Sequence, residues 1–439
     1  MKFTKMSLVA ALLIGSSAFA IDNIKMSGNA QLNYSTSDAK SGYAAISNKD
    51  SLFSKDNSAA DAALNLNITA DLAKNDLVSV SAGAGYTVLS TLGLENNLVS
   101  NVWGGAHTAT VPTGARYASV LGGAKVENAN WMNEAWVAVS LNKGSKSTLK
   151  LGRMELDTPL AFTETWSIEK NTFEAAVVVN QDIPDTTLVG AYVGNGNGTE
   201  TFGQDARSGV NKTYHLATAP VVNANGQFTT YGTNGAYAVG VINNSFKPVV
   251  AQAWYYDVSG VATAYWLQAD LKCKKIPGLL AGAQYTSVKA AASGAKSDNV
   301  YAVMLGYEMK DIATFKAAYS SVNNDGSIGY AGFNTATNVA TAQSKLYTEA
   351  WWNYGQVTMK STDSYHVSIE GNYQTVDLGF YYTYADHDKS VSSHDLTEYA
   401  LTASKSFGPL DTTLAYINYD LGKNVDTVNM IQAYLTLNF

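Results

Sequence analysis

Apolar and polar residues alternate one by one over much of this chain. Between Ala62 and Leu72 every even position is Ala, Leu or Ile, and most odd positions are Asn, Thr or Asp. From Tyr301 to Met309 the odd positions read Tyr, Val, Leu, Tyr and Met. A period of two predicts β-strands with one apolar and one polar face. Aliphatic residues between two tyrosines are typical of a strand face that crosses lipid between two membrane interfaces.

The same alternation predicts eighteen strands along the chain. They begin near Ile24, Ala62, Leu77, Trp131, Ser147, Thr172, Thr186, Gly235, Lys247, Val261, Gly278, Asn299, Ile312, Ser364, Val376, Leu396, Asp411 and Val428. One further segment, Lys345 to Asn353, is assigned to a loop. The strands thus cover most of the chain after residue 20.

The connections between these strands alternate between short and long. Ala73 to Asp76 and Gln181 to Asp185 are short, whereas Ser90 to Asn130 and Val322 to Asp363 are long. Membrane barrels have short periplasmic turns and long external loops, and inside a bilayer a sheet must close to satisfy its backbone polar groups. We therefore predict an all-β fold, a transmembrane antiparallel β-barrel over residues 21–439 with both ends on the periplasmic side.

The first twenty residues differ from the rest. Two lysines and an apolar run from Ser7 to Gly15 precede the small-x-small sequence Ala18-Phe19-Ala20. This order predicts a cleaved secretory signal peptide over residues 1–20, and the run is too short for a membrane-spanning helix.

Composition fits a secreted membrane barrel and excludes some partners. Charged residues make up 15% of the chain, below the roughly 25% of soluble domains. Without the signal peptide, 27 basic residues (29 minus 2) face 36 acidic ones, a net charge of −9 (27 minus 36). This acidity argues against a nucleic-acid partner. Cys273 is the only cysteine, so no intramolecular disulfide forms, and we interpret it as a turn residue.

Charged residues on the polar strand faces are predicted to line the lumen. An eighteen-stranded barrel encloses a lumen too wide for side chains to fill, so its wall tolerates polar groups. Strand alternation places six charged residues there: Glu134, Lys150, Lys316, Glu370, Asp377 and Glu398. The alternative is that they line the wall without selecting any solute.

Two stretches carry a more specific signal. Residues 149–195, beginning LKLGRMELDTPL, resemble the OprD-type outer-membrane porins, in which a Gly-Arg-x-Glu-like turn with Thr-Pro precedes an acidic loop and a Phe-containing strand. The matching positions are Gly152, Arg153, Glu155, Leu156, Thr158, Pro159, Phe173 and Ala175. The segment LYTEAWWNYG, the signal peptide and the last strand, which ends in Phe439, are similar to those of epsilonproteobacterial major outer membrane porins.

This resemblance implies a location, a function and partners. It implies a protein of the Gram-negative bacterial outer membrane that forms a water-filled channel for ions and small hydrophilic solutes. It also implies a homotrimer in contact with outer-membrane lipid and lipopolysaccharide, and a third external loop folded into the pore. No cofactor is expected, with calcium as the alternative. A terminal Phe439 resembles the signal read by the barrel assembly machinery.

One departure from the family bears on the solute. OprD-type substrate-specific channels have a ladder of arginines, but this chain has only Arg116, Arg153 and Arg207. A general porin therefore fits better than a carboxylate-selective one. Two alternatives stay open: an adhesin or structural barrel, which a conductance measurement separates from a porin, and a barrel hydrolase, for which no nucleophile motif is present.

The third loop, Met154 to Asn171, is the candidate pore constriction. Its charged residues are Arg153 at the edge, Glu155, Asp157, Glu164, Glu169 and Lys170. Carboxylates at a constriction concentrate cations and oppose anions, so we predict a weak cation preference. Glu164 and Glu169 are the expected contributors, because Glu155 lies beside Arg153 and is expected to be partly neutralised. The alternative is a solvated acidic loop.

Two further loops offer weak metal-binding patterns. Asp386, His387, Asp388, His394 and Asp395 combine oxygen and nitrogen donors, but their spacing matches no defined site. Asn323, Asn324 and Asp325 resemble a fragment of a calcium loop that lacks the glutamate of an EF-hand. A solvated loop and a turn are the simpler interpretations, and calcium binding is left without assigned ligands.

Overall fold

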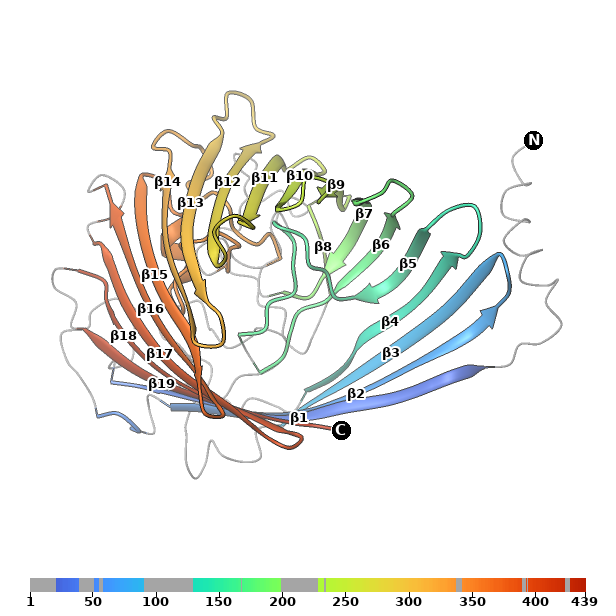
Figure 1. Cartoon of the computed structure of the whole chain (residues 1–439), viewed down its shortest axis with the longest axis horizontal. Helices are drawn as coiled ribbons and strands as arrows, with labels where there is room; N and C mark the ends of the chain where they lie inside the picture. Colours follow the sequence, from blue (N-terminus) through green and yellow to red (C-terminus); the bar gives the residue numbers. More distant parts are fainter. Residues whose placement is uncertain are drawn as a thin grey trace.

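The strands form one closed antiparallel ring in this computed structural model (Figure 1). The structure describes residues 21–38, 51–54, 58–90, 129–166, 168–198, 228–232, 234–336, 342–388, 392, 394–422 and 427–439. The expected signal peptide, residues 1–20, lies outside the described residues. Within them, no helix has the length and hydropathy to cross a membrane.

Eighteen long strands make up the closed ring. A further strand of two residues pairs with the loop end of one of them. The first ten are β1 (Asp22–Ser37), β2 (Ser58–Lys74), β3 (Val78–Ser90), β4 (Ala129–Leu141), β5 (Ser147–Met154), β6 (Phe173–Asn180), β7 (Thr186–Gly196), β8 (Thr229–Thr230), β9 (Ala236–Asn243) and β10 (Val249–Val258). The others are β11 (Ala262–Lys272), β12 (Leu279–Ala290), β13 (Asp298–Met309), β14 (Ala313–Val322), β15 (Thr362–Tyr373), β16 (Val376–His387), β17 (Leu396–Phe407), β18 (Leu410–Asp420) and β19 (Val428–Asn438).

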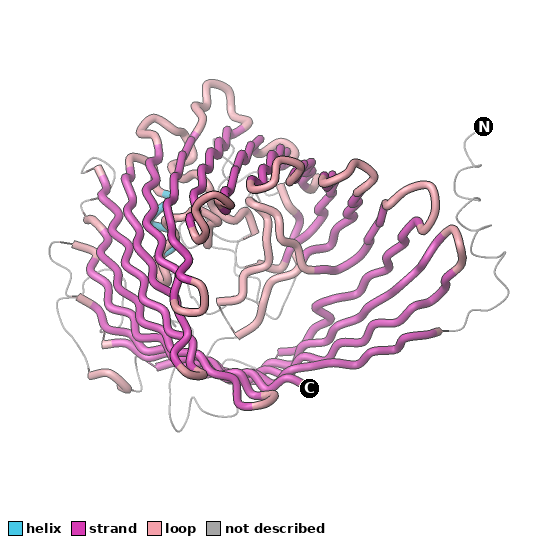
Figure 2. The backbone as a smooth tube through the Cα atoms, viewed as in Figure 1, coloured by secondary structure: helices cyan, strands magenta, loops and turns pink. Residues whose placement is uncertain are grey.

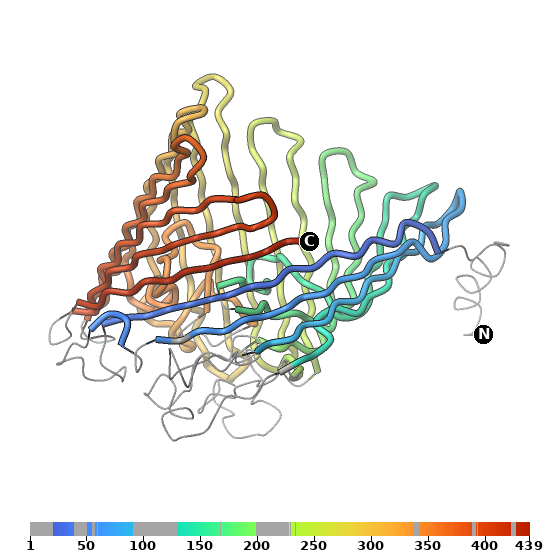
Figure 3. Tube along the Cα trace, turned by 90° about the horizontal axis from the view of Figure 1, so that it is seen from below, coloured from blue at the N-terminus to red at the C-terminus, as the bar shows by residue number. Residues whose placement is uncertain are grey.

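Strand pairing confirms the predicted barrel of eighteen strands. Each long strand pairs antiparallel with its sequence neighbour, and β1 also pairs with β19, from Asn29 opposite Asn438 to Ser37 opposite Met430. The short β8 pairs only with the outer end of β7, where β9 continues the ring. Every predicted strand start lies within four residues of the observed one. In Figure 3, β1 to β3 slope gently across the view, whereas the strands of the far side, in green and yellow, run nearly vertically.

The alternation of side chains separates an apolar outside from a polar inside. On β2, Leu64, Leu66 and Ile68 are exposed, whereas Asn65 between them is buried. On β13, Val303 and Leu305 are exposed between Tyr301 and Tyr307. In water such a surface would be unfavourable over this area, so the outer face fits the hydrocarbon of a bilayer.

Tyrosines form a belt on the outer face near the loop end of the barrel. Neighbouring strands place Tyr192 beside Tyr237, with ring centroids 5.1 Å apart, and Tyr255 beside Tyr265, 5.3 Å apart. The belt continues at Tyr319, which contacts both Tyr301 and Tyr365. Tyrosine is favoured at this depth because its ring sits in the apolar region while its hydroxyl reaches water.

Candidate functional site

Two loops lie inside the ring of strands (Figure 2). The third loop, residues 155–172, connects β5 to β6, and the seventh loop, residues 323–361, connects β14 to β15. The seventh loop contains one turn of 3-10 helix, η4 (Tyr354–Thr358). The segment Lys345 to Asn353, assigned to a loop from the sequence, belongs to it.

Gly152 explains how the third loop leaves β5. Its φ is +125°, and an added Cβ would lie 2.1 Å from the carbonyl oxygen of Ala135 on β4. Only glycine fits at such a position. Beyond it, Thr158 turns the chain back, because its hydroxyl and its N–H both donate to the carbonyl of Ala161. Gly152 and Thr158 of the sequence motif therefore each have a local structural role.

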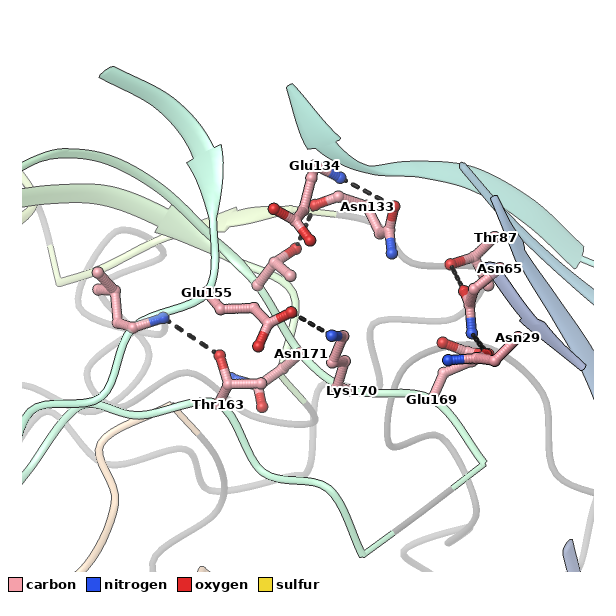
Figure 4. Close-up of polar contacts among 12 residues, drawn as sticks. Asn29, Asn65, Thr87, Asn133, Glu134, Glu155, Thr163, Glu169, Lys170 and Asn171 are labelled. Atoms are coloured by element: carbon pink, nitrogen blue, oxygen red, sulfur yellow. Dashed lines mark hydrogen bonds and ion pairs between the residues drawn. The ribbon is translucent and has the colours of Figure 1, made fainter. Parts of the chain in front are cut away.

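Four of the charged side chains expected at the constriction are held in ion pairs. Arg153 pairs with Glu174 at 2.8 Å, and Glu155 pairs with Lys170 (Figure 4). The prediction that Arg153 partly neutralises Glu155 is therefore wrong, because the partner of Glu155 is Lys170. Asp157 pairs with Lys345 of the seventh loop. These pairs are partly exposed, so water screens them.

Glu164 connects the two loops from a buried position. Its carboxylate accepts hydrogen bonds from Trp166 Nε1 at 2.8 Å, Asn334 Nδ2 at 2.9 Å and the backbone N–H of Gln343 at 3.0 Å. Only 1% of the residue is exposed. Asn334 also bonds the backbone of Phe162 in both directions. Glu164 is therefore a structural acceptor between the loops, not a side chain free in the lumen.

Glu169 fastens the third loop to the opposite wall. Its carboxylate accepts a hydrogen bond from Asn65 Nδ2 of β2 at 2.8 Å, and Asn29 and Thr87 support that asparagine from β1 and β3 (Figure 4). Burial raises the pKa of Glu169 to about 7, although the bond from Asn65 and the charge of Lys170 oppose this shift. Close to neutral pH, the residue is therefore only partly ionised.

The seventh loop is fastened to the wall by residues that sequence analysis did not assign to it. The carboxylate of Glu398 on β17 accepts bonds from the backbone N–H groups of Trp352, at 2.9 Å, and Asn353, at 3.0 Å. Tyr347 donates its hydroxyl proton to Asp270 on β11. A Cβ on Gly282 would lie 2.3 Å from that hydroxyl, so glycine makes room for the ring.

Glu398 shows the limit of the lumen prediction. The alternation of the strand correctly predicts that Glu398 points inward. The seventh loop covers it, however, and only 1% of the residue is exposed. The sequence feature that could have indicated this cover is the adjacent pair Trp351 and Trp352 in a long loop. Large apolar rings in a long connection need a surface to cover.

The other residues predicted to line the lumen remain more accessible. Lys150 lies 4.2 Å from the ring centre of Trp136, whose indole N–H donates to Glu134. On the far wall, Lys316 of β14 lies 3.4 Å from Glu370 of β15.

Asp377 lies near the turn between β15 and β16. It accepts a hydrogen bond from Asn372 Nδ2 at 2.9 Å. The two remain exposed at the periplasmic end of these strands.

Two cavities lie between the seventh loop and the wall formed by β13 to β19. The first has a volume of about 550 Å³ and is lined by residues of both loops and of the wall. The second, of about 690 Å³, lies toward the short turns at Asp311 and Asp377. Trp351, Glu370 and Tyr381 line both cavities.

Among the described residues, no three His, Cys, Asp or Glu side chains are placed to hold a metal ion. His387 contacts Thr362 Oγ1 through Nδ1 and Gln356 Oε1 through Nε2. Asp325 pairs with Lys296 at 3.2 Å, in a turn. Cys273 lies in the turn between β11 and β12, where its sulfur accepts the N–H of Ile276 at 3.4 Å.

Phe439 closes the seam between β19 and β1. Its N–H and carbonyl exchange hydrogen bonds of 3.0 and 2.8 Å with Gly28. A Cβ on Gly28 would lie 2.6 Å from the phenyl ring, so the glycine leaves the space that the ring occupies.

Comparison with known proteins identifies the fold. No family model matches the chain, and no curated protein matches it. Solved structures do. Pseudomonas aeruginosa OccK1 (OpdK) matches with a TM-score of 0.69 at 12% identity, over 95% of this chain and 99% of that one. OccK9 (OpdG) of the same organism gives 0.69 at 11%, over 96% and 100%. Acinetobacter baumannii OccAB4 gives 0.67 at 11%, over 94% and 98%.

These similarities confirm the OprD-type fold over nearly the whole described barrel. One of the similar structures is described as an outer membrane protein. The chain thus has the architecture of a transmembrane β-barrel of the bacterial outer membrane.

Proposed function

We propose that this protein is a porin of the outer membrane, a water-filled channel for passive diffusion of ions and small hydrophilic solutes. The observation that carries the proposal is a closed barrel with an apolar outer face and two loops inside it that leave cavities against a polar wall. A ring of this size cannot be filled by side chains alone. The epsilonproteobacterial type of porin remains part of this proposal, and rests on the sequence resemblance.

The channel is proposed to prefer cations weakly, with the third loop at the constriction. Two of its carboxylates, on Glu155 and Asp157, are matched by lysines. The remaining negative charge of the loop comes from Glu164 and Glu169. Buried charges are screened less than exposed ones, so they act on ions in the lumen without contacting them. This field is expected to fade in concentrated salt.

Planar-bilayer recording tests both statements. Stepwise conductance in salt solution is expected for the purified protein, and its absence contradicts the porin. In a salt gradient, replacing Glu164 and Glu169 together by glutamine should move the reversal potential toward anions. Glutamine suits this test because its amide oxygen can still accept the bonds from Asn334 and Asn65. Asp182→Asn, on a turn outside the lumen, is the matched control.

Assembly and partners form a separate part of the proposal. Phe439 is proposed as the signal for the barrel assembly machinery, and the barrel as a homotrimer in outer-membrane lipid and lipopolysaccharide. Phe439→Ala should lower the amount of heat-modifiable barrel in the outer membrane, and Phe439→Tyr, which keeps a ring, should lower it less. Native electrophoresis of the wild-type protein tests the trimer.

The hydrolase alternative gains no observation from the structure. His366 is directed inward, and its Nδ1 contacts Thr383 Oγ1 at 2.9 Å. Thr383 thus has a base at hydrogen-bond distance, but a nucleophile also needs a third group that holds the base in position. Among the described residues, no side chain forms a hydrogen bond with the other ring nitrogen of His366. We therefore propose no enzymatic activity.

A further inference from the structure

The larger of the two loops lines the first cavity with aromatic rings. Trp351 and Trp352 come from the seventh loop together with Tyr347, Trp166 comes from the third loop, and Tyr381 and Tyr434 come from the wall. Together with polar side chains, they surround about 550 Å³. Specific small-molecule pockets have volumes of about 300–1,000 Å³, so this space is large enough to hold a solute.

Trp351 and Tyr381 lie where the two cavities adjoin. Their ring centres are 5.0 Å apart, with planes 33° apart. Both rings line both cavities, as does Glu370. A solute that moves between the cavities therefore passes an aromatic surface and a carboxylate at the same point.

Polar groups where the two cavities adjoin are balanced in charge. Lys316 lies 3.4 Å from Glu370, and Tyr381 donates its hydroxyl proton to the same carboxylate at 2.8 Å. The other acid on the cavity, Glu349, accepts the N–H of Ser344, and burial raises its pKa to about 8. It is therefore mainly protonated at neutral pH, so the lining has no strong preference for either sign of charge.

We infer that the first cavity is a subsite for an uncharged pyranose sugar, with Trp351 and Tyr381 as the stacking surface and Lys316 and Glu370 as hydrogen-bonding partners of its hydroxyls. This inference rests on the proposed porin function and names a solute class for it. A pyranose ring has an apolar C–H face and a rim of hydroxyls. Aromatic rings beside a donor and an acceptor match both features.

Ring shape separates this subsite from a cavity that holds any polar solute. Sorbitol carries at least as many hydroxyls as a hexopyranose but lacks a rigid ring face. It should reach the polar groups without stacking on Trp351. Benzoate has an aromatic face but carries a charge that the balanced lining does not favour.

The test is the block of single-channel current by added solutes in planar bilayers. Glucose or maltose should produce concentration-dependent interruptions of the current, whereas sorbitol and benzoate at equal concentration should not. Trp351→Leu keeps an apolar side chain but removes the ring, and should weaken the sugar block about tenfold. Trp351→Phe should retain most of it.

Trp136→Leu is the matched control, because this tryptophan contacts Lys150 on the other wall and lines neither cavity. It should leave the sugar block unchanged. Normal conductance without a sugar block overturns the subsite and leaves the porin intact. Equal block by sorbitol, or an unchanged block in Trp351→Leu, also overturns it. Absence of any conductance overturns the porin and the subsite together.

Discussion

The third and seventh loops both lie inside the barrel, but they use their residues in different ways. The third loop is short and acidic, and its four carboxylates are all engaged, two with lysines and two in buried hydrogen bonds. The seventh loop is long and aromatic, and it lines both cavities through Trp351. The loop whose charges stand out in the sequence thus fastens the two loops and the wall to one another, and the loop with few charges forms the surface that we propose a solute meets.

The comparison teaches that carboxylates which stand out in the sequence of a loop can serve to anchor that loop. A carboxylate can accept several backbone and side-chain donors at once, which makes it an effective fastening for an irregular loop. Glu398 does this for the seventh loop from the wall, and Glu164 does it between the loops. Four predictions test this division of roles, in order of decreasing effect.

The largest effect is expected from Glu398→Ala. This change leaves the N–H groups of Trp352 and Asn353 without their acceptor, and hydrogen bonds to a charged group contribute about 1.5–3 kcal/mol each. A loss of about 3 kcal/mol favours release of the seventh loop by roughly a hundredfold. We expect higher and noisier single-channel conductance.

The control for this change is Asp377→Ala, an inward carboxylate that accepts a hydrogen bond from Asn372 and, among the described residues, forms no hydrogen bond or ion pair with the seventh loop. Its conductance should stay steady. Equal noise in both variants would show that loss of any lumen carboxylate disturbs the current, and that Glu398 is no anchor.

Glu164→Ala should have the next largest effect, because it removes one buried link between the two loops, while the bonds of Asn334 with Phe162 remain. Asn334 and Gln343 lose an acceptor, at a cost of about 2 kcal/mol. We expect flickering between conductance levels and faster proteolysis within the loops. Glu155→Ala, which breaks only the partly exposed pair with Lys170, should show neither.

A pH effect of intermediate size is expected at Glu169. Its folded pKa is raised from 4.5 to about 7, so its contribution to loop docking is complete below pH 4.5 and is lost as the pH rises through 7. Over the same range the residue gains negative charge. Cation preference should therefore increase between about pH 6 and about pH 8, as measured by reversal potential.

The matching variant is Glu169→Gln, which keeps an acceptor for Asn65 but does not titrate. Its reversal potential should be flat over that range. If the cation preference of this variant increases with pH as it does in the wild type, another group is responsible for the titration.

The smallest effect is expected from Asp157→Asn. This residue joins the third loop to Lys345 of the seventh, but its side chain is 89% exposed. Exposed pairs contribute little because water and salt screen them. Conductance and reversal potential should equal those of the wild type, and a clear change in either would show that a surface contact contributes to holding the loops.

The sequence predicts the strands well and the loops poorly, for a physical reason. A strand that crosses a bilayer must alternate over its whole length, so β2 and β13 can be recognised from side chains alone. Loop position depends instead on single long-range contacts, such as Glu169 with Asn65 and Glu398 with Trp352. No local pattern encodes these pairs.

The charged site residues show the same limit. Alternation gives the direction of Glu398, but not that a loop covers it. Proximity in sequence suggested Arg153 as the partner of Glu155, yet the two side chains find Glu174 and Lys170. Burial, which makes a carboxylate available as an anchor for a loop, depends on segments far away in the chain.

The contact at Gly28 has a consequence for how the chain folds and assembles. Until β19 arrives, β1 has one free edge, and a free strand edge is a template for pairing with other chains. The contact that removes this edge is completed by Phe439, whose ring fits only because Gly28 carries no side chain. A chain in which this contact cannot form keeps the edge of β1 free, and therefore remains able to pair with other chains.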